Sequence, residues 1–196
     1  DAPGARWTLI DDDPGLLSHA DRLAARLGAR AETRRLDLAA APDAALDGAP
    51  ALVTASAFFD LVSAEWIERF ADAAAAAGAA IYAALTYDGS ELWTPDHPED
   101  ATVRAAFAAS MRRDKGFGPA LGGDAAAALA TALAERGYRV ETAPAPWRLE
   151  RARDAALISA LAEGQAQATG ASPGWRRARK AAETVEIGHL DLLATP

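Results

Sequence analysis

The sequence predicts an α/β protein in which a mostly parallel β-sheet is covered by helices on both faces. Three observations predict this fold. Short apolar runs alternate with segments in which apolar residues recur at helical spacing. The apolar runs are nearly continuous, which is typical of strands buried on both faces of a parallel sheet. Turn residues separate the two kinds of segment. Together these observations indicate a doubly wound, Rossmann-like sheet.

The first strand is expected over residues 6–11, a buried run of aromatic and β-branched residues. Asp13 and Pro14 have the residue types of a helix N-cap and a first helical position, so a helix follows and ends at Gly28. Further strands with the same apolar character are expected over residues 33–38, 50–54 and 80–86. The second and third of these flank a helix that Ser63 caps and Gly78 ends.

The second half of the chain predicts more helices and a different kind of strand. Residues 87–98 and 114–119 are polar or glycine-rich and are expected to form loops. Helices are expected over residues 99–112, 124–136, 149–168 and 175–182. The run 138–143 alternates like an edge strand, and 185–193 is expected to be the final strand. At least one of these two late strands should run antiparallel to the sheet.

Composition limits the class of protein. The chain has 196 residues, 51% of them hydrophobic and 24% charged, which is close to one globular domain. It has no apolar run long enough for a membrane-spanning helix. The absence of cysteine excludes disulfides and thiolate chemistry and favours a cytoplasmic location. A net charge of -8 argues against general nucleic-acid binding.

The start of the chain predicts that it is a fragment. Its single methionine is Met111, and the sequence begins at Asp1. The opening residues lack the charged start and apolar core of a signal peptide. We therefore expect part of the domain to be missing from the N-terminal side.

Ligands of open parallel sheets bind beyond the carboxyl ends of the strands, so the residues there are the candidate site. Asp11 suits the two hydroxyls of a ribose, because a carboxylate is an acceptor with several lone-pair sites. Asp37 could accept a hydrogen bond from the amine of a purine. Capping of the next helix is the alternative role for Asp12 and Asp13, and an ordinary turn is the alternative for Asp37.

The order of these segments resembles the class I S-adenosylmethionine-dependent methyltransferases, and most closely a group of uncharacterised bacterial members. Three motifs carry the resemblance, and they lie at 7–14, 35–38 and 53–61. It extends less sharply through 85–89, 114–118, 146–149 and 188–193, and so covers essentially the whole chain. The resemblance implies a single methyltransferase-like domain over 1–196, with a late antiparallel strand. It implies a methyl transfer from S-adenosyl-L-methionine to an acceptor that the residues do not identify.

The resemblance also implies which residues bind the cofactor. Those carried over are Asp11, Asp12, Asp37, Leu38, Thr54, Ala55 and Ser56. Asp11 corresponds to the acidic residue at the ribose, and Asp37 with the backbone of Leu38 to the adenine contacts. The family's first strand and its glycine-rich loop should precede Arg6 and have no counterpart here. That strand belongs between the strands at 6–11 and 50–54. We therefore expect a direct ladder between these two strands, a partner chain in the gap, or a segment supplied by the true gene product.

Acceptor binding is assigned to Phe59, Tyr87, Lys115 and Phe117, which follow strand ends or lie in an irregular glycine-rich loop. Methyl transfer draws much of its rate from positioning, so a catalytic base is not obligatory. Where one is needed, the candidates are Tyr87, Asp88 and His189. The scattered histidines show no metal-ligand spacing, so no metal is predicted.

Two alternatives to an enzyme of this type stay open. The first is a non-catalytic interaction protein on a degenerate methyltransferase fold, which the missing glycine-rich loop favours. The second is a receiver-type signalling domain, since Asp11 to Asp13 resemble its acidic metal-binding cluster, although its expected lysine is not found before Lys115. The basic run 175–180 indicates either an anionic contact or a solvated helix face.

Overall fold

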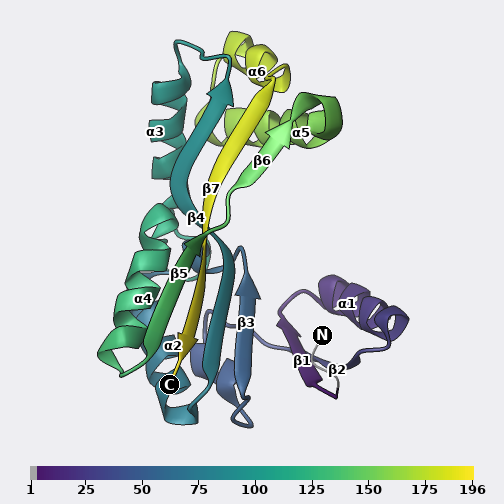
Figure 1. Ribbon diagram of the computed structural model, residues 1–196, viewed down its shortest axis with the longest axis vertical. Coiled ribbons are helices and arrows are strands. Elements are labelled where there is room, and N and C mark those ends of the chain that lie inside the picture. The colour runs from purple at the N-terminus through teal and green to yellow at the C-terminus, as the bar shows by residue number, and fades with distance from the viewer. Residues whose placement is uncertain (1–3) are drawn as a thin grey trace.

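The computed structural model describes residues 4–196 and shows an α/β protein with two lobes and a smaller N-terminal unit (Figure 1). The strands are β1 (Arg6–Asp11), β2 (Arg30–Arg35), β3 (Leu52–Ser56), β4 (Ala80–Thr94), β5 (Arg139–Pro144), β6 (Trp147–Glu150) and β7 (Thr184–Thr195). The helices are α1 (Pro14–Leu27), α2 (Ala64–Ala77), α3 (Asp100–Met111), α4 (Ala125–Glu135), α5 (Arg151–Thr169) and α6 (Pro173–Lys180). Short 3₁₀ segments are η1 (Pro42–Leu46), η2 (Phe59–Leu61) and η3 (Gly122–Asp124).

The main sheet has the order β3-β4-β7-β5, and β6 pairs with the outer part of β7. β3 runs parallel to β4, whereas β7 runs antiparallel to β4, β5 and β6. The predicted α/β class with a late antiparallel strand is therefore confirmed, but the main sheet is mixed because β7 runs antiparallel to each of its neighbours. β1 and β2 form a separate parallel pair beside this sheet.

β1 and β3 do not pair with each other, so the predicted direct ladder between them is wrong. β1 was also expected to be buried, yet its first half is exposed and Trp7 keeps 39% of its surface accessible. The reason is that β1 has a strand neighbour on one side only. An apolar strand is shielded from water only when it has a neighbouring strand on each side and a helix that covers its face.

Three predicted boundaries are also wrong. β2 covers 30–35 in place of 33–38, because it starts directly after the Gly28 cap of α1. Residues 87–94, predicted as a loop, continue β4, because the long strand β7 supplies hydrogen-bond partners up to Thr94. Residues 147–150, whose last two were assigned to a helix, form β6 against β7.

The helix ends follow the predicted capping. The Asp13 side chain accepts from the backbone N–H of Gly15 at 2.6 Å, and Ser63 accepts from that of Trp66 at 3.2 Å. Gly28 and Gly78 end α1 and α2 in the left-handed conformation, which glycine adopts without a steric penalty.

Two apolar cores hold the larger lobes together. The first lies between the sheet and helices α2 and α4, and includes Trp66, Phe70 and Leu129. The second lies in the other lobe, where the outer parts of β4 and β7 pack against α5 (Figure 1). Both cores use β4 and β7, so these two strands position each lobe relative to the other.

Trp66 ties the segment after β2 to the main core. Its indole Nε1 donates to the carbonyl oxygen of Leu38 at 2.7 Å, while its ring stacks on Phe70 with centroids 5.3 Å apart. The indole is 4% exposed, so this hydrogen bond is shielded from water. The exit from the N-terminal unit is thereby fixed against α2.

We expect Trp66→Phe to lower the free energy of unfolding by about 1–3 kcal/mol, because Phe keeps an aromatic ring but leaves the Leu38 carbonyl without its donor. Trp147→Phe is the control, since that indole is 36% exposed and donates no hydrogen bond among the described residues. Urea unfolding of both variants checks this. Equal losses in both would contradict the proposed tie.

Candidate functional site

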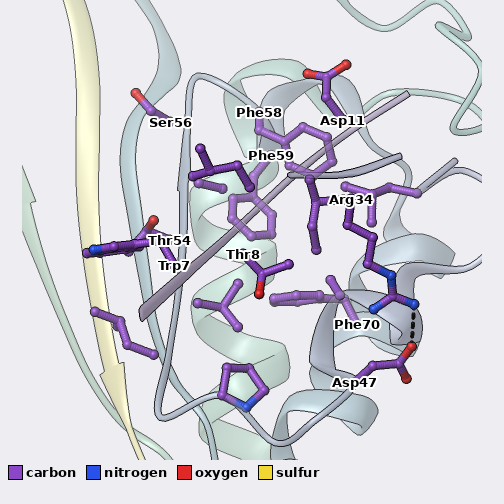
Figure 2. Close-up of a pocket in the computed structure, with 18 of the residues that line it drawn as sticks. Trp7, Thr8, Asp11, Arg34, Asp47, Thr54, Ser56, Phe58, Phe59 and Phe70 are labelled. Carbon is purple, nitrogen blue, oxygen red and sulfur yellow. Dashed lines mark hydrogen bonds and ion pairs between the residues drawn. The ribbon is translucent and has the colours of Figure 1, made fainter. Parts of the chain in front are cut away.

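A cleft of about 450 Å³ separates the N-terminal unit from the main sheet. All residues of β1 and β3 line it, and Phe58, Phe59 and Phe70 form an apolar wall (Figure 2). Figure 2 shows Asp11 and Ser56 toward one end of the cleft, and these are the last residues of their strands. The cleft therefore includes the carboxyl ends of β1 and β3, each of which belongs to a parallel pair of strands. Ligands of α/β proteins bind beyond this end of the strands.

The structure brings together most of the residues assigned to the cofactor. Asp11, Leu38, Thr54, Ala55 and Ser56 all line the cleft. The Asp11 Oδ1 atom accepts from the backbone N–H of Asp13 at 2.8 Å, which holds the carboxylate at the strand end.

Asp12 and Asp37 do not line this cleft. Asp12 forms an exposed ion pair with Arg35, with N and O atoms 3.1 Å apart. Asp37 accepts from the backbone N–H of Ala39 at 2.9 Å, which is the turn geometry given as its alternative role. Asp37 lies just before Leu38, so it flanks the cleft without forming its wall.

The residue after the carboxyl end of β3 and the neighbouring residue in the middle of β4 have an unusual backbone conformation. Ala57 and Leu85 have φ angles of 51° and 53°, which side-chain-bearing residues seldom adopt. The Ala57 N–H donates to the Ala84 carbonyl at 3.0 Å, and the Leu85 N–H donates to Asp191 Oδ1 at 2.8 Å. These hydrogen bonds hold both residues in a strained backbone conformation. Such strain is often found at ligand-binding sites.

A second group of candidate residues lies on β4 and β7. The rings of Tyr87 and His189 have centroids 6.3 Å apart, and Trp147 lies 5.1 Å from His189. Burial, with a smaller contribution from the Glu91 carboxylate, raises the pKa of Tyr87 to about 12. The Tyr87 phenol is therefore protonated at physiological pH.

Asp60 is a buried acidic residue that the sequence reasoning did not assign to the site. It lies in η2, directly after β3, and is 6% exposed. Its Oδ1 atom has no hydrogen-bond partner among residues 4–196. Burial raises the pKa of Asp60, although a backbone hydrogen bond and the nearby charges of His189 and Lys115 oppose the rise. The signal in the sequence was its position after a predicted strand, within Phe58 to Leu61.

The structure gives local roles to the other assigned residues. Phe59 is buried in the aromatic wall, and Phe117 packs edge-on against Phe58 with centroids 5.5 Å apart. The Lys115 Nζ atom donates to the Met111 carbonyl at 2.8 Å, near the end of α3. Asp88 accepts from the backbone N–H of Ser90 at 2.8 Å. Lys115 and Asp88 thus stabilise chain reversals, and neither lines the cleft.

The basic run 175–180 is not a solvated patch throughout. Arg179 is 1% exposed, donates to the Pro95 carbonyl at 2.7 Å and lies over the Trp93 ring. Arg176 and Lys180 both pair with Glu163. The cluster therefore serves mainly to pack α6 on its own lobe.

Within residues 4–196, no group of three or more His, Asp or Glu side chains is arranged to hold a metal ion. Asp13 caps α1 and Asp12 pairs with Arg35, so the acidic run after β1 is engaged in local contacts. No helix among the described residues is both long and apolar enough to cross a membrane.

No family model and no curated protein matches the chain. One similar solved structure is that of a protein studied for the conversion of a disulfide bond into a thioacetal group during echinomycin biosynthesis (17% identity, TM-score 0.48). A second is geranyl diphosphate methyltransferase in complex with SAM (10% identity, TM-score 0.47). The alignments cover 98% of this chain in both cases, and 67% and 70% of the other proteins.

A third similar structure is an O-methyltransferase family protein from Burkholderia thailandensis, at 15% identity and a TM-score of 0.42. That alignment covers 93% of this chain, which spans only 42% of the other protein. All three likenesses have TM-scores below 0.5 and carry no inference about activity.

We expect Asp60→Asn to raise the free energy of unfolding at pH 7 by roughly 1–3 kcal/mol, because it removes a buried charge that lacks a full set of partners. The raised pKa of Asp60 in the folded protein means that its protonated form favours folding. The charged carboxylate therefore lowers stability at neutral pH, and this loss disappears as the pH falls below the ordinary pKa of aspartate. Thermal unfolding from pH 3.5 to 7 should show a gain that shrinks in acid. A pH-independent difference would contradict this assignment.

Proposed function

We propose that this chain is an S-adenosylmethionine-dependent methyltransferase whose cofactor binds at the carboxyl end of the cleft between β1 and β3. One observation carries the proposal. The Asp11 carboxylate and the end of β3 lie toward the same end of one cleft, whose apolar wall is aromatic (Figure 2). The cleft thus offers a hydrogen-bond acceptor for ribose hydroxyls and an apolar surface for a base. A nucleoside ligand requires both.

Residues that line the cleft offer groups to the ribose, the adenine and the methionine end of the cofactor, while the family's glycine-rich loop has no counterpart among them. Asp11 would accept hydrogen bonds from the ribose. The Leu38 carbonyl already accepts from Trp66, so its N–H is the backbone group left for the adenine edge. Thr54, Ala55 and Ser56 would lie at the methionine end, since they complete β3.

When bound, the cofactor supplies an electrophilic methyl group on a sulfonium sulfur. The chain's own task is to hold the acceptor in line with that group and to exclude water, which can supply much of the rate. An acceptor oxygen or nitrogen also loses a proton. His189 and Asp60 are the candidate groups to receive it on the β7 and η2 side, and Tyr87 would orient the acceptor by donating a hydrogen bond.

Calorimetric titration of the intact protein with S-adenosylmethionine tests the proposal. We expect Asp11→Ala to weaken binding by about 1.5–3 kcal/mol, the range for a hydrogen bond to a charged group. Asp11→Asn keeps an acceptor for the Asp13 N–H, so it separates the loss of charge from a disturbed turn. Asp21→Ala, on the exposed side of α1, is the control.

Unchanged affinity in Asp11→Ala would remove Asp11 from the cofactor site. No binding of S-adenosylmethionine or its demethylated product by the intact, folded protein would overturn the proposed function itself.

A further inference from the structure

The ladder between β4 and β7 contains a β-bulge close to the candidate cofactor site. Between two regular pairs of this ladder, Ala84 and Leu85 of β4 lie opposite the single residue Asp191 of β7. Leu85 has a φ angle of 53°, in the left-handed region that favours glycine. A leucine keeps this conformation only where contacts with the surrounding structure hold it.

The Asp191 side chain supplies two contacts that hold the bulge. Its Oδ1 atom accepts from the Leu85 N–H at 2.8 Å, and its Oδ2 atom accepts from the Tyr82 hydroxyl at 2.8 Å. Both donors belong to β4, on either side of Ala84. The carboxylate therefore ties β7 to the strained residue and to the regular part of β4 that precedes it.

The bulge is joined directly to the end of β3. The Ala57 N–H donates to the Ala84 carbonyl oxygen at 3.0 Å, and Ala57 also has a positive φ angle of 51°. Ala57 follows Ser56, the last residue of β3, which lines the cleft. A continuous path through Leu85 and the Ala84 carbonyl thus runs from Asp191, which does not line the cleft, to the backbone beside Ser56.

We propose that Asp191 is a positioning residue for the methionine end of the candidate cofactor site. Its carboxylate holds Leu85 in the bulge, and the bulge aims the Ala84 carbonyl at Ala57. That hydrogen bond in turn fixes the backbone around Ser56. The identity of the ligand rests on the proposed function, whereas the path from Asp191 to Ser56 does not.

The same bulge orders the acceptor side of the proposed site. Successive residues of a strand face opposite sides of the sheet, so one extra residue reverses the facing of every residue beyond it. Tyr87 lies just beyond the bulge, and its ring lies near those of Phe107 and His189, with centroids 6.1 and 6.3 Å away. Loss of the bulge would turn Tyr87 away from both rings.

A role of Asp191 in overall stability alone predicts a different pattern of protection. The β3–β4 pair has a backbone hydrogen bond at each end. At the end far from the bulge, the Ala80 N–H donates to the Ala51 carbonyl at 3.0 Å. A loss of overall stability would expose the amides of Ala57 and Ala80 alike, whereas loss of positioning would expose Ala57 selectively.

Native-state amide hydrogen exchange, followed by NMR on the ligand-free protein, tests the path. We expect Asp191→Ala to accelerate exchange of the Ala57 amide at least tenfold more than that of Ala80. Asp191→Asn should restore protection, because its amide oxygen still accepts from the Leu85 N–H. Tyr82→Phe is the control, since it removes only the second contact of the carboxylate. Equal acceleration at Ala57 and Ala80 would overturn the proposal.

A glycine variant tests the role of strain and keeps the experiment decisive if Asp191→Ala alone does not fold. Glycine adopts a positive φ angle without a steric penalty, so Leu85→Gly should make the bulge less dependent on the carboxylate. We expect Asp191→Ala to accelerate Ala57 exchange at least threefold less in the Leu85→Gly protein than Asp191→Glu does in the natural one. An equal or larger acceleration would contradict the proposed role.

Calorimetric titration with S-adenosylmethionine tests the link to the cofactor. We expect Asp191→Ala to weaken binding at least fivefold, and Asp191→Asn and Tyr82→Phe to stay within twofold of the natural protein. Unchanged affinity in Asp191→Ala would overturn the positioning role. If the natural protein binds no S-adenosylmethionine, the proposed function and the assignment of Asp191 to its cofactor site both fall. Ala57 exchange would then still decide whether Asp191 controls the end of β3.

Discussion

The antiparallel ladder between β4 and β7 is the interaction on which the rest of the structure depends. It runs from Ile81 opposite Ala194 to Thr94 opposite Thr184, and each lobe builds its core on one half of it. Two register shifts interrupt it, next to Thr86 and between Tyr87 and Glu91. At the first shift, the Asp191 carboxylate accepts from the Leu85 N–H and from the Tyr82 hydroxyl. The candidate acceptor-side residues are therefore placed by backbone pairing.

The candidate cofactor site, by contrast, lies at a strand edge that is not paired. β3 is held on one side by β4, and its other edge opens on the cleft toward β1. The aromatic wall behind it is rigid because Phe58, Phe59, Trp66 and Phe70 contact one another edge-on or stacked. A rigid apolar wall facing a carboxylate gives the site its proposed preference for a nucleoside.

Both lobes contain buried polar side chains with atoms that have no hydrogen-bond partner among residues 4–196. In the outer lobe, Glu91 accepts a hydrogen bond from Gln165, and Arg179 pairs with Asp100 beside the Trp93 ring. These contacts hold helices in place, although Gln165 Oε1 and two guanidinium nitrogens of Arg179 have no hydrogen-bond partner among residues 4–196. Asp60, in η2 of the other lobe, also keeps an oxygen without a hydrogen-bond partner. A buried acid without a full set of partners is a candidate for function, because structure alone does not require it.

The sequence by itself determined the alternation of strands and helices, the caps at Asp13 and Ser63, and the carboxylate at the end of β1, because these depend on local periodicity and turn chemistry. Only the tertiary structure decided the length of β4, the existence of β6 and the burial of Asp60. Each of these depends on a partner far away in the chain: β7 for the two strands, and the surrounding core for the carboxylate. The exposure of β1 has the same cause, since burial of an apolar strand requires neighbours that its own residues do not specify.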